Sequence, residues 1–432
     1  MAITTAPAKP ETDRDRTATT HAPPYEQTGN VAGVSQEQWV DLQLEPRGAP
    51  TELGGPFTRV HVFWLAGMSC DGCSIAVLGA TAPAVESLLT GKLPGVPLVL
   101  LHHTALQVEA GEAFMEPMRK AAEGTLEDPY VVVYEGSIAN EDLLGDGNAG
   151  YWSAIGEEVD ESSGEKTQVP SAIWLRRMAP GAAAVIAIGT CATWGGVPAA
   201  INNVTDSMSV ADWLGSDYRS ALGLPVVNVP GCSPVGDNFT ETVAVTLLFL
   251  QRLGPAPELD ELGRPAWLFG ETVHRTCTRA GFYEEGSFAK TFGDKECLVE
   301  IGCWGPVVNC NITSRGAINH LGGCMNVGGA CIGCTMPGFP DKFAPFYKAP
   351  PGTIISGSGA KILGGFVRPL RLITQRKLNR EGRWDREGTT PGGWGAAPRT
   401  TLFDKTVDTF YDWLRKRGVY GSAKEAGKNR WS

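Results

Sequence analysis

The sequence predicts an α/β protein in which a doubly wound parallel sheet, covered by helices on both faces, precedes a loop-rich domain. Short runs of Val, Ile and Leu alternate with helical stretches up to about residue 255, and few periodic segments follow. Near-continuous apolar strands are typical of a parallel sheet that is buried on both faces. At 432 residues the chain is long enough to form two domains.

The expected strands share one pattern, a short apolar run that ends in glycine or a small polar residue. The first begins near Phe57 and runs into a glycine turn, after which a helix opens with Cys70 and Cys73 at its N-terminal end. Further strands are expected within residues 96–106, 128–138, 182–192 and 224–232, and helices within 110–124 and 240–254. His102 and His103 are expected just after a strand end, without a metal-binding role.

Four segments follow from this pattern. Residues 1–55 lack periodicity and form a flexible extension, whereas residues 56–255 form the parallel-sheet domain. Residues 256–345 form a cysteine-rich domain with little apolar patterning, so inorganic clusters are expected to stabilise it. Residues 346–432 form a C-terminal extension with an amphipathic helix at 401–421 and a polar tail.

Composition excludes several classes of function. The net charge is -10 without a basic block, which argues against a nucleic-acid partner. No apolar run approaches the roughly 18 residues that a transmembrane segment needs. The N-terminal residues resemble neither a secretory nor a twin-arginine signal. We therefore expect a cytoplasmic protein, and leave open whether it associates peripherally with a membrane.

The cysteines are the most informative residues in the chain. A reducing cytoplasm favours metal ligation over disulfides, and an odd number of cysteines cannot all pair. Each lies in a C-x-x-C or H-x-x-C pair, or in a glycine-rich loop near one. Eleven cysteines and one histidine make twelve candidate ligands, as many as three four-ligand clusters need. The set is Cys70, Cys73, Cys191, Cys232, His274, Cys277, Cys297, Cys303, Cys310, Cys324, Cys331 and Cys334.

The spacing of these ligands favours clusters over other uses of cysteine. Cys70, Cys191 and Cys232 each fall just past the end of an expected strand, which suits a cluster lying across one edge of the sheet. Nearby glycines let backbone N–H groups approach a negatively charged cluster. Structural zinc remains the main alternative, although zinc ribbons favour two nearby C-x-x-C pairs. A thioredoxin-like dithiol would leave nine cysteines without a role.

Several motifs in fixed order resemble the small, electron-transferring subunit of nickel-iron hydrogenases. The resemblance covers about residues 58 to 345. Because we find no export signal, the chain is similar to the actinobacterial-type uptake hydrogenases within this family. The motifs are W-L-x-G-x-x-C-x-G-C at Trp64 to Cys73, Y-E-G-S-I at Tyr134 to Ile138, G-T-C-A-x-x-G-G at Gly189 to Gly196, P-G-C at Pro230 to Cys232, H-x-x-C at His274, C-L-V-E-I-G-C-W-G-P at Cys297 to Pro306 and C-I-G-C at Cys331.

The resemblance implies a flavodoxin-like sheet domain, a loop-rich iron-sulfur domain and three 4Fe-4S clusters. Electrons from hydrogen oxidation on a nickel-iron large subunit would pass through these clusters to a quinone or a carrier protein. No catalytic residue would lie on this chain, and the assembly would be a dimer of heterodimers or larger. The implied iron ligands are Cys70, Cys73, Cys191 and Cys232 for the proximal cluster, Cys310, Cys324, Cys331 and Cys334 for the medial cluster, and His274, Cys277, Cys297 and Cys303 for the distal cluster.

Four positions depart from the family pattern or leave a role open. Cys324 stands where many relatives have proline, so a fourth thiolate implies a 4Fe-4S medial cluster instead of a three-iron one. Gly72 stands where oxygen-tolerant membrane-bound relatives add a cysteine. Asp71 either caps a helix or is solvated, or it replaces a thiolate at the proximal cluster. Glu135 either serves proton traffic at the subunit interface or accepts backbone hydrogen bonds.

Two alternative functions remain. An iron-sulfur subunit of another redox complex, such as the related quinone-linked NADH dehydrogenase subunit, would share a proximal-type site but lack the H-x-x-C motif and the other two sets. A zinc-stabilised interaction module would be colourless and hold zinc instead of iron.

Overall fold

The structure is a computed structural model that describes residues 55–144, 151–159 and 164–341. The expected N-terminal extension, and the C-terminal extension with its helix and tail, lie outside the described residues. In the part of the chain that is described, no helix has the length and apolarity required to cross a membrane.

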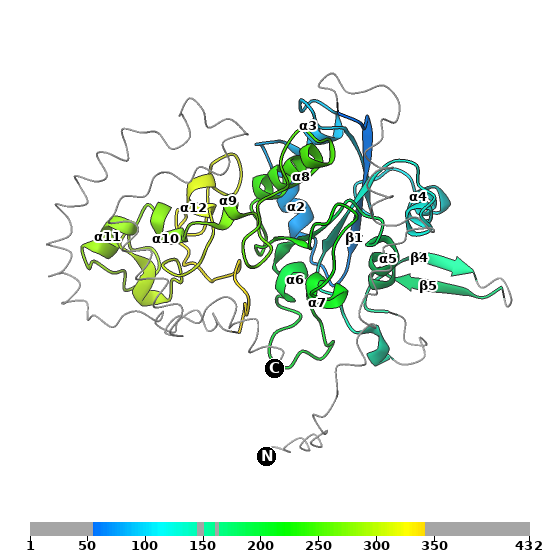
Figure 1. The fold of residues 1–432 in the computed structure, drawn as a ribbon. Coiled ribbons are helices and arrows are strands. Elements are labelled where there is room, and N and C mark those ends of the chain that lie inside the picture. Colours follow the sequence, from blue (N-terminus) through cyan, green and yellow to red (C-terminus); the bar gives the residue numbers. More distant parts are fainter. Residues whose placement is uncertain (1–54, 145–150, 160–163, 342–432) are drawn as a thin grey trace, which may run out of the picture.

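A five-stranded parallel sheet forms the centre of the first domain (Figure 1). Its spatial order is β2-β1-β3-β6-β7, and every neighbouring pair is parallel. Counted along the chain, this is the order 2-1-3-4-5 of flavodoxin-like folds, so the predicted fold class is confirmed. The strands are β1 (Arg59–Ala66), β2 (Leu98–His103), β3 (Tyr130–Glu135), β6 (Ala184–Ile188) and β7 (Val227–Val229).

Helices cover both faces of the sheet. Successive strand residues point to opposite faces, and here the residues on both faces are apolar. On β1, Val62 and Trp64 belong to one apolar cluster, whereas Phe63 and Leu65 belong to the other. The first face packs against α2 (Gly72–Leu78), α3 (Val85–Leu89) and α8 (Gly236–Leu250). The second face packs against α4 (Glu112–Ala122), α5 (Ser171–Met178), α6 (Gly189–Trp194) and α7 (Val210–Leu214).

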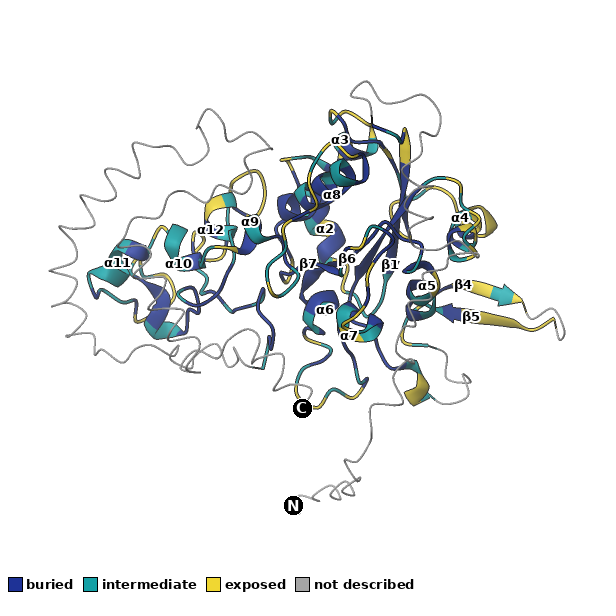
Figure 2. Cartoon of the chain, viewed as in Figure 1, coloured by how far each residue is buried: buried dark blue, intermediate teal, exposed yellow. Residues whose placement is uncertain are grey.

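A two-stranded antiparallel hairpin projects from this domain and was not expected from the sequence (Figure 1). It consists of β4 (Ala154–Val159) and β5 (Lys166–Pro170), and follows the short 3-10 helix η1 (Glu141–Leu144). Figure 2 shows it exposed along much of its length. Its strands are rich in Glu, Lys and Gln and lack an apolar run, which explains why no strand was predicted there.

The second domain is loop-rich, as expected, and the cysteines form part of its core. Val273, Leu298 and Trp304 pack together with the buried Cys303 and Cys331, and three more cysteines pack against this cluster. The helical segments are short: α9 (Ala266–Phe269), α10 (Val273–Thr276), α11 (Ala280–Glu284), η2 (Leu298–Ile301) and α12 (Ile312–Arg315).

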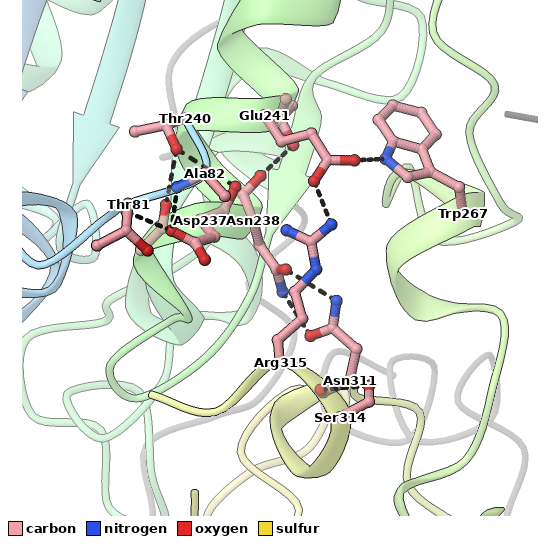
Figure 3. A network of polar contacts seen from close by, with 12 residues as sticks. Thr81, Ala82, Asp237, Asn238, Thr240, Glu241, Trp267, Asn311, Ser314 and Arg315 are labelled. Carbon is pink, nitrogen blue, oxygen red and sulfur yellow. Dashed lines mark hydrogen bonds and ion pairs between the residues drawn. The ribbon is translucent and has the colours of Figure 1, made fainter. Parts of the chain in front are cut away.

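Polar contacts connect the N-terminal half of α8 to the cysteine-rich domain (Figure 3). Asn238 and Asn311 exchange two amide hydrogen bonds of 2.9 and 2.8 Å. Glu241 accepts a hydrogen bond of 2.8 Å from Trp267 Nε1 and forms an ion pair with Arg315. The helix that covers the sheet therefore also fixes the position of the segment around Cys310.

Candidate metal-cluster sites

Four cysteines meet at the carboxyl edge of the sheet. Cys70 follows β1, Cys73 lies in the first turn of α2, Cys191 lies in α6 directly after β6, and Cys232 follows β7. Burial raises the pKa of the Cys73 thiol, and the charges of Glu135 and of the other three cysteines raise it further. The structure therefore brings together the four residues that the resemblance assigns to the proximal cluster.

Two glycines allow the loops to close around these sulfurs. A Cβ on Gly189 would lie 2.3 Å from Cys73 Sγ, and one on Gly196 would lie 2.7 Å from Cys191 Sγ. Both glycines also have positive φ, 81° and 56°, which other residues rarely adopt. Any side chain at either position would displace a sulfur, so the backbone is shaped around the thiols themselves.

The medial set comes from the loops that follow η2. Burial raises the pKa of Cys310 to about 11, and the charge of Cys324 contributes to the increase. Burial raises the pKa of Cys334 as well, followed by the charges of Cys310 and Cys324. Burial raises the pKa of Cys331, and the charges of Cys303, Cys334 and Cys310 raise it further. All four predicted members are thus neighbours.

The distal set contains three neighbouring thiols. Burial raises the pKa of Cys297 to about 12, and the charges of Cys303 and Cys277 act in the same direction. The backbone N–H of Arg279 donates to Cys277 Sγ at 3.4 Å. His274 lies in α10, one turn before Cys277, and its ring packs edge-on against Tyr283 with the centroids 4.5 Å apart. Its role as the fourth ligand stays a prediction.

The three sets form a continuous chain. The backbone N–H of Cys331 donates to Cys303 Sγ at 3.3 Å, which connects the medial set to the distal set. The backbone N–H of Cys232 acts on the Cys334 thiol and lowers its pKa, opposing the effect of burial, which connects the proximal set to the medial set. Each neighbouring pair of sets is therefore in contact through one cysteine of each set.

These thiols fit iron-sulfur chemistry. Burial strongly favours the neutral thiol, so a buried thiolate requires a bound cation to stabilise it. Backbone N–H groups directed at sulfur are a recognised feature of iron-sulfur sites. Among residues 55–144, 151–159 and 164–341, no group of three or more His, Cys, Asp or Glu side chains is arranged to hold a single metal ion.

Asp71 does not cap α2. It occupies the N-cap position with φ at 58° and ψ at 7°, and its side chain makes no capping hydrogen bond. An N-cap residue usually has an extended backbone that turns its side chain toward the first-turn N–H groups, and this left-handed conformation does not. The capping prediction is therefore wrong, and an exposed, solvated carboxylate or a cluster ligand remains.

Glu135 is 1% exposed and accepts hydrogen bonds from four groups. Trp64 Nε1 donates at 2.9 Å, the Cys73 N–H at 3.1 Å and the Ser74 N–H at 3.4 Å, and Ser74 Oγ completes the set. The predicted role as an acceptor of backbone hydrogen bonds is confirmed. The carboxylate orients the C-x-x-C loop from the end of β3.

Ser74 and His103 belong to this site and were missed in the sequence. His103 Nε2 lies 2.9 Å from Ser74 Oγ, and the Ala105 N–H donates to His103 Nδ1 at 3.0 Å. That second bond makes Nε2 the protonated nitrogen, so His103 donates to Ser74. His102 and His103 are also the last two residues of β2, not the residues after it.

The fold and its cysteine sets define a class of protein, a flavodoxin-like domain joined to a cysteine-rich domain, as in electron-transfer subunits. The family model of the NADH ubiquinone oxidoreductase 20 Kd subunit matches residues 70–246. The model of the C-terminal part of the NiFe/NiFeSe hydrogenase small subunit matches residues 269–347.

Relatives and solved structures narrow this class. The chain is 33% identical over 293 residues to the periplasmic [NiFeSe] hydrogenase small subunit of Desulfomicrobium baculatum, covering 67% of this chain and 88% of the relative. It is 31% identical over 353 residues to the Hydrogenase-2 small chain of Escherichia coli K12, covering 76% of this chain and 86% of the relative. A structure of the actinobacterial-type NiFe-hydrogenase from Ralstonia eutropha H16 is similar at 47% identity and a TM-score of 0.67, covering 78% of this chain and 95% of that chain.

This chain belongs to the family of nickel-iron hydrogenase small subunits. Such subunits transfer electrons through iron-sulfur clusters and pair with a large subunit, which carries the catalytic site. The match over residues 269–347 covers the H-x-x-C motif and the medial and distal cysteines, which the alternative NADH dehydrogenase subunit was expected to lack.

Proposed function

We propose that this chain relays electrons from hydrogen oxidation through three 4Fe-4S clusters, proximal, medial and distal, to an external acceptor. The main support for this proposal is that contacts between cysteines connect each set to the next. Cys232 and Cys334 connect the first two sets, and Cys331 and Cys303 connect the last two. The clusters, when bound, supply one-electron oxidation and reduction.

The residues of this chain would hold, orient and shield those clusters. Glu135 holds the Cys73 and Ser74 N–H groups, which fixes the C-x-x-C loop at the edge of the sheet. Burial of Cys73, Cys303 and Cys331 keeps water away from the relay. His274 in place of a thiolate would raise the distal potential, because a neutral imidazole ligand stabilises the reduced cluster relative to a thiolate.

Two ligand assignments go beyond the common family pattern. Cys324 provides a fourth medial thiolate, and its proximity to Cys310 and Cys334 supports that role. Asp71 is proposed as a substitute ligand of the proximal cluster, since it is exposed between Cys70 and Cys73 and does not cap α2. Glu135 positions the C-x-x-C loop through its hydrogen bonds. In addition, we propose that it lies on a proton route at the subunit interface.

The large subunit would cover the surface beside the proximal set. Ile75 and Leu78 on α2 are 68% and 49% exposed, and Cys70 and Cys232 are exposed as well. Apolar side chains next to exposed ligands favour burial by a partner. The acceptor is proposed to be a quinone or a carrier protein, in a dimer of heterodimers or a larger assembly located in the cytoplasm.

Metal and sulfide analysis of the anaerobically purified complex tests this function. Three 4Fe-4S clusters require about twelve iron and about twelve acid-labile sulfide ions per small subunit. Nickel should copurify on a companion chain, and zinc should be absent. Markedly less iron with all ligands intact, or zinc in its place, would contradict the proposal and favour a zinc-stabilised module.

A further inference from the structure

Helix α6 connects the proximal ligands to the medial ligands. It carries Cys191, and its side chains at positions i and i+4 reach two consecutive carbonyl groups of the other domain. Thr190 Oγ1 donates to the carbonyl oxygen of Cys334, and Trp194 Nε1 donates to that of Thr335 at 3.3 Å. A single turn of helix therefore holds both a proximal ligand and the backbone of a medial ligand.

Thr190 is also attached to the loop that carries Cys232. Its backbone N–H donates to the Gly231 carbonyl at 3.0 Å, and its hydroxyl accepts the Gly231 N–H at 3.1 Å. The side chain is 1% exposed, so water cannot replace these partners. One buried hydroxyl thus bridges the residue before Cys232 and the carbonyl of Cys334, which belong to different clusters.

We propose that the Thr190 hydroxyl is a positioning group that fixes the separation of the proximal and medial clusters, and thereby the rate of electron transfer between them. The inference rests on the proposed three-cluster relay. In the step concerned, one electron would pass from the reduced proximal cluster, which would be oxidised, to the oxidised medial cluster, which would be reduced. No bond or proton is exchanged.

The physical reason is the steep dependence of tunnelling on distance. Without the hydroxyl, the Gly231 N–H and the Cys334 carbonyl lose a buried partner, and the two loops must move to find others. Any such movement changes the distance between the clusters. Tunnelling rates fall exponentially with distance, whereas the magnetic dipolar coupling of two reduced clusters falls with its cube.

The test compares four forms of the anaerobic complex: wild type, Thr190→Val, Thr190→Ser and Thr193→Val. Thr193 lies in the same helix and is also buried, and its hydroxyl donates to the carbonyls of Gly189 and Thr190 in that helix. Electron paramagnetic resonance of the reduced protein measures the coupling between the proximal and medial clusters. Freeze-quench spectra after a hydrogen pulse measure how fast the medial cluster is reduced.

We expect Thr190→Val to weaken or broaden the coupling and to slow reduction of the medial cluster, while Thr190→Ser and Thr193→Val keep the wild-type values. Wild-type coupling in Thr190→Val, or an equal change of coupling in Thr193→Val, would overturn the role of Thr190 but not the three-cluster function. Absence of two coupled centres in the wild type would overturn the three-cluster function as well.

If Thr190→Val does not assemble, a second variant tests the same connection. Trp194→Phe keeps an aromatic ring but removes the Nε1 donor to Thr335. A change of coupling in the same direction supports the role of α6 as the connecting element. An unchanged coupling in this variant, with Thr190→Val unable to load clusters, would reduce Thr190 to a folding role and overturn the inference.

Discussion

Asn238 and Asn311 form a reciprocal amide pair between the sheet domain and the cysteine-rich domain (Figure 3). Asn238 lies in α8 and is 1% exposed, and Asn311 directly follows Cys310. Each amide therefore satisfies the other at a position where water has little access. The pair ties the segment around Cys310, which is proposed to be a medial ligand, to the helix that packs on the sheet.

Replacing Asn238 with Ala should destabilise this junction by about 1–3 kcal/mol, because the Asn311 amide loses its buried partner. The melting temperature of the intact complex measures the loss. A double-mutant cycle with Asn311→Ala should reveal a positive coupling energy. Asn326→Ala is the control, since the hydrogen bonds of Asn326 to Thr278, Thr313 and Gly322 all lie within the second domain. Additive effects of Asn238→Ala and Asn311→Ala would contradict this account.

Replacing Glu135 with Gln should raise the midpoint potential of the proximal cluster. The buried carboxylate bonds to the Cys73 N–H at 3.1 Å, and its negative charge opposes the additional electron of the reduced cluster. Gln keeps the size of the side chain but removes the charge. Redox titration followed by electron paramagnetic resonance measures the shift, and Glu158→Gln on the exposed hairpin serves as the control. A lowered potential would be incompatible with the assigned role.

Much of the sheet, and the meeting of four cysteines at its carboxyl edge, were predictable from the sequence because their signals are local. The runs that became β1, β3 and β6 are apolar, and Cys70, Cys191 and Cys232 follow strand ends within a few residues. The carboxyl edge of a parallel sheet then determines that they meet.

The contacts around those ligands depend on register and on residues far apart in the chain. His103 lies beside Trp64 and Glu135 lies beside Ala66 only because β2 and β3 flank β1 in that register. Thr190 and Cys334 are 144 positions apart. The prediction that Asp71 caps α2 failed for a different reason: its backbone is left-handed, and its side chain makes no capping hydrogen bond.

Replacing Cys324 with Pro should leave a three-iron medial cluster. Cys324 is exposed, whereas Cys310 and Cys334 are partly buried and Cys331 is buried. The substitution therefore removes the most exposed of the four proposed ligands. Iron analysis should show about one iron fewer per chain, and the oxidised protein should gain the signal of a three-iron centre. An unchanged iron count would refute the assignment of Cys324 to this cluster.

Replacing Asp71 with Ala separates its two remaining roles. A ligating carboxylate would affect the spectrum and potential of the proximal cluster, because the substitution removes a bond to iron. A solvated carboxylate would leave the spectrum unchanged, since Asp71 makes no capping hydrogen bond whose loss could disturb α2. Mössbauer or electron paramagnetic resonance spectra of the proximal cluster decide between them, with Asp142→Ala, at an exposed position in η1, as the control.

A pair of buried histidines should make the protein less stable in mild acid. His61 Nδ1 lies 2.7 Å from His102 Nε2 across β1 and β2. Burial, and then the charge of His61, lowers the pKa of His102 from 6.5 to about 4, against the opposing effects of Glu109 and Gln107. Burial also lowers the pKa of His61, although nearby Asp128 opposes this and Arg59 adds to it.

Between pH 6.5 and about 4 the unfolded chain therefore binds a proton at His102 that the folded chain excludes. Unfolding becomes easier as the pH falls through this range, by about 1 kcal/mol for this group between pH 7.5 and 5.5. His102→Gln should flatten the dependence of the melting temperature on pH, whereas His320→Gln at an exposed position should not. If His102→Gln melts with the same pH dependence as the wild type, proton exclusion at this pair does not limit stability in acid.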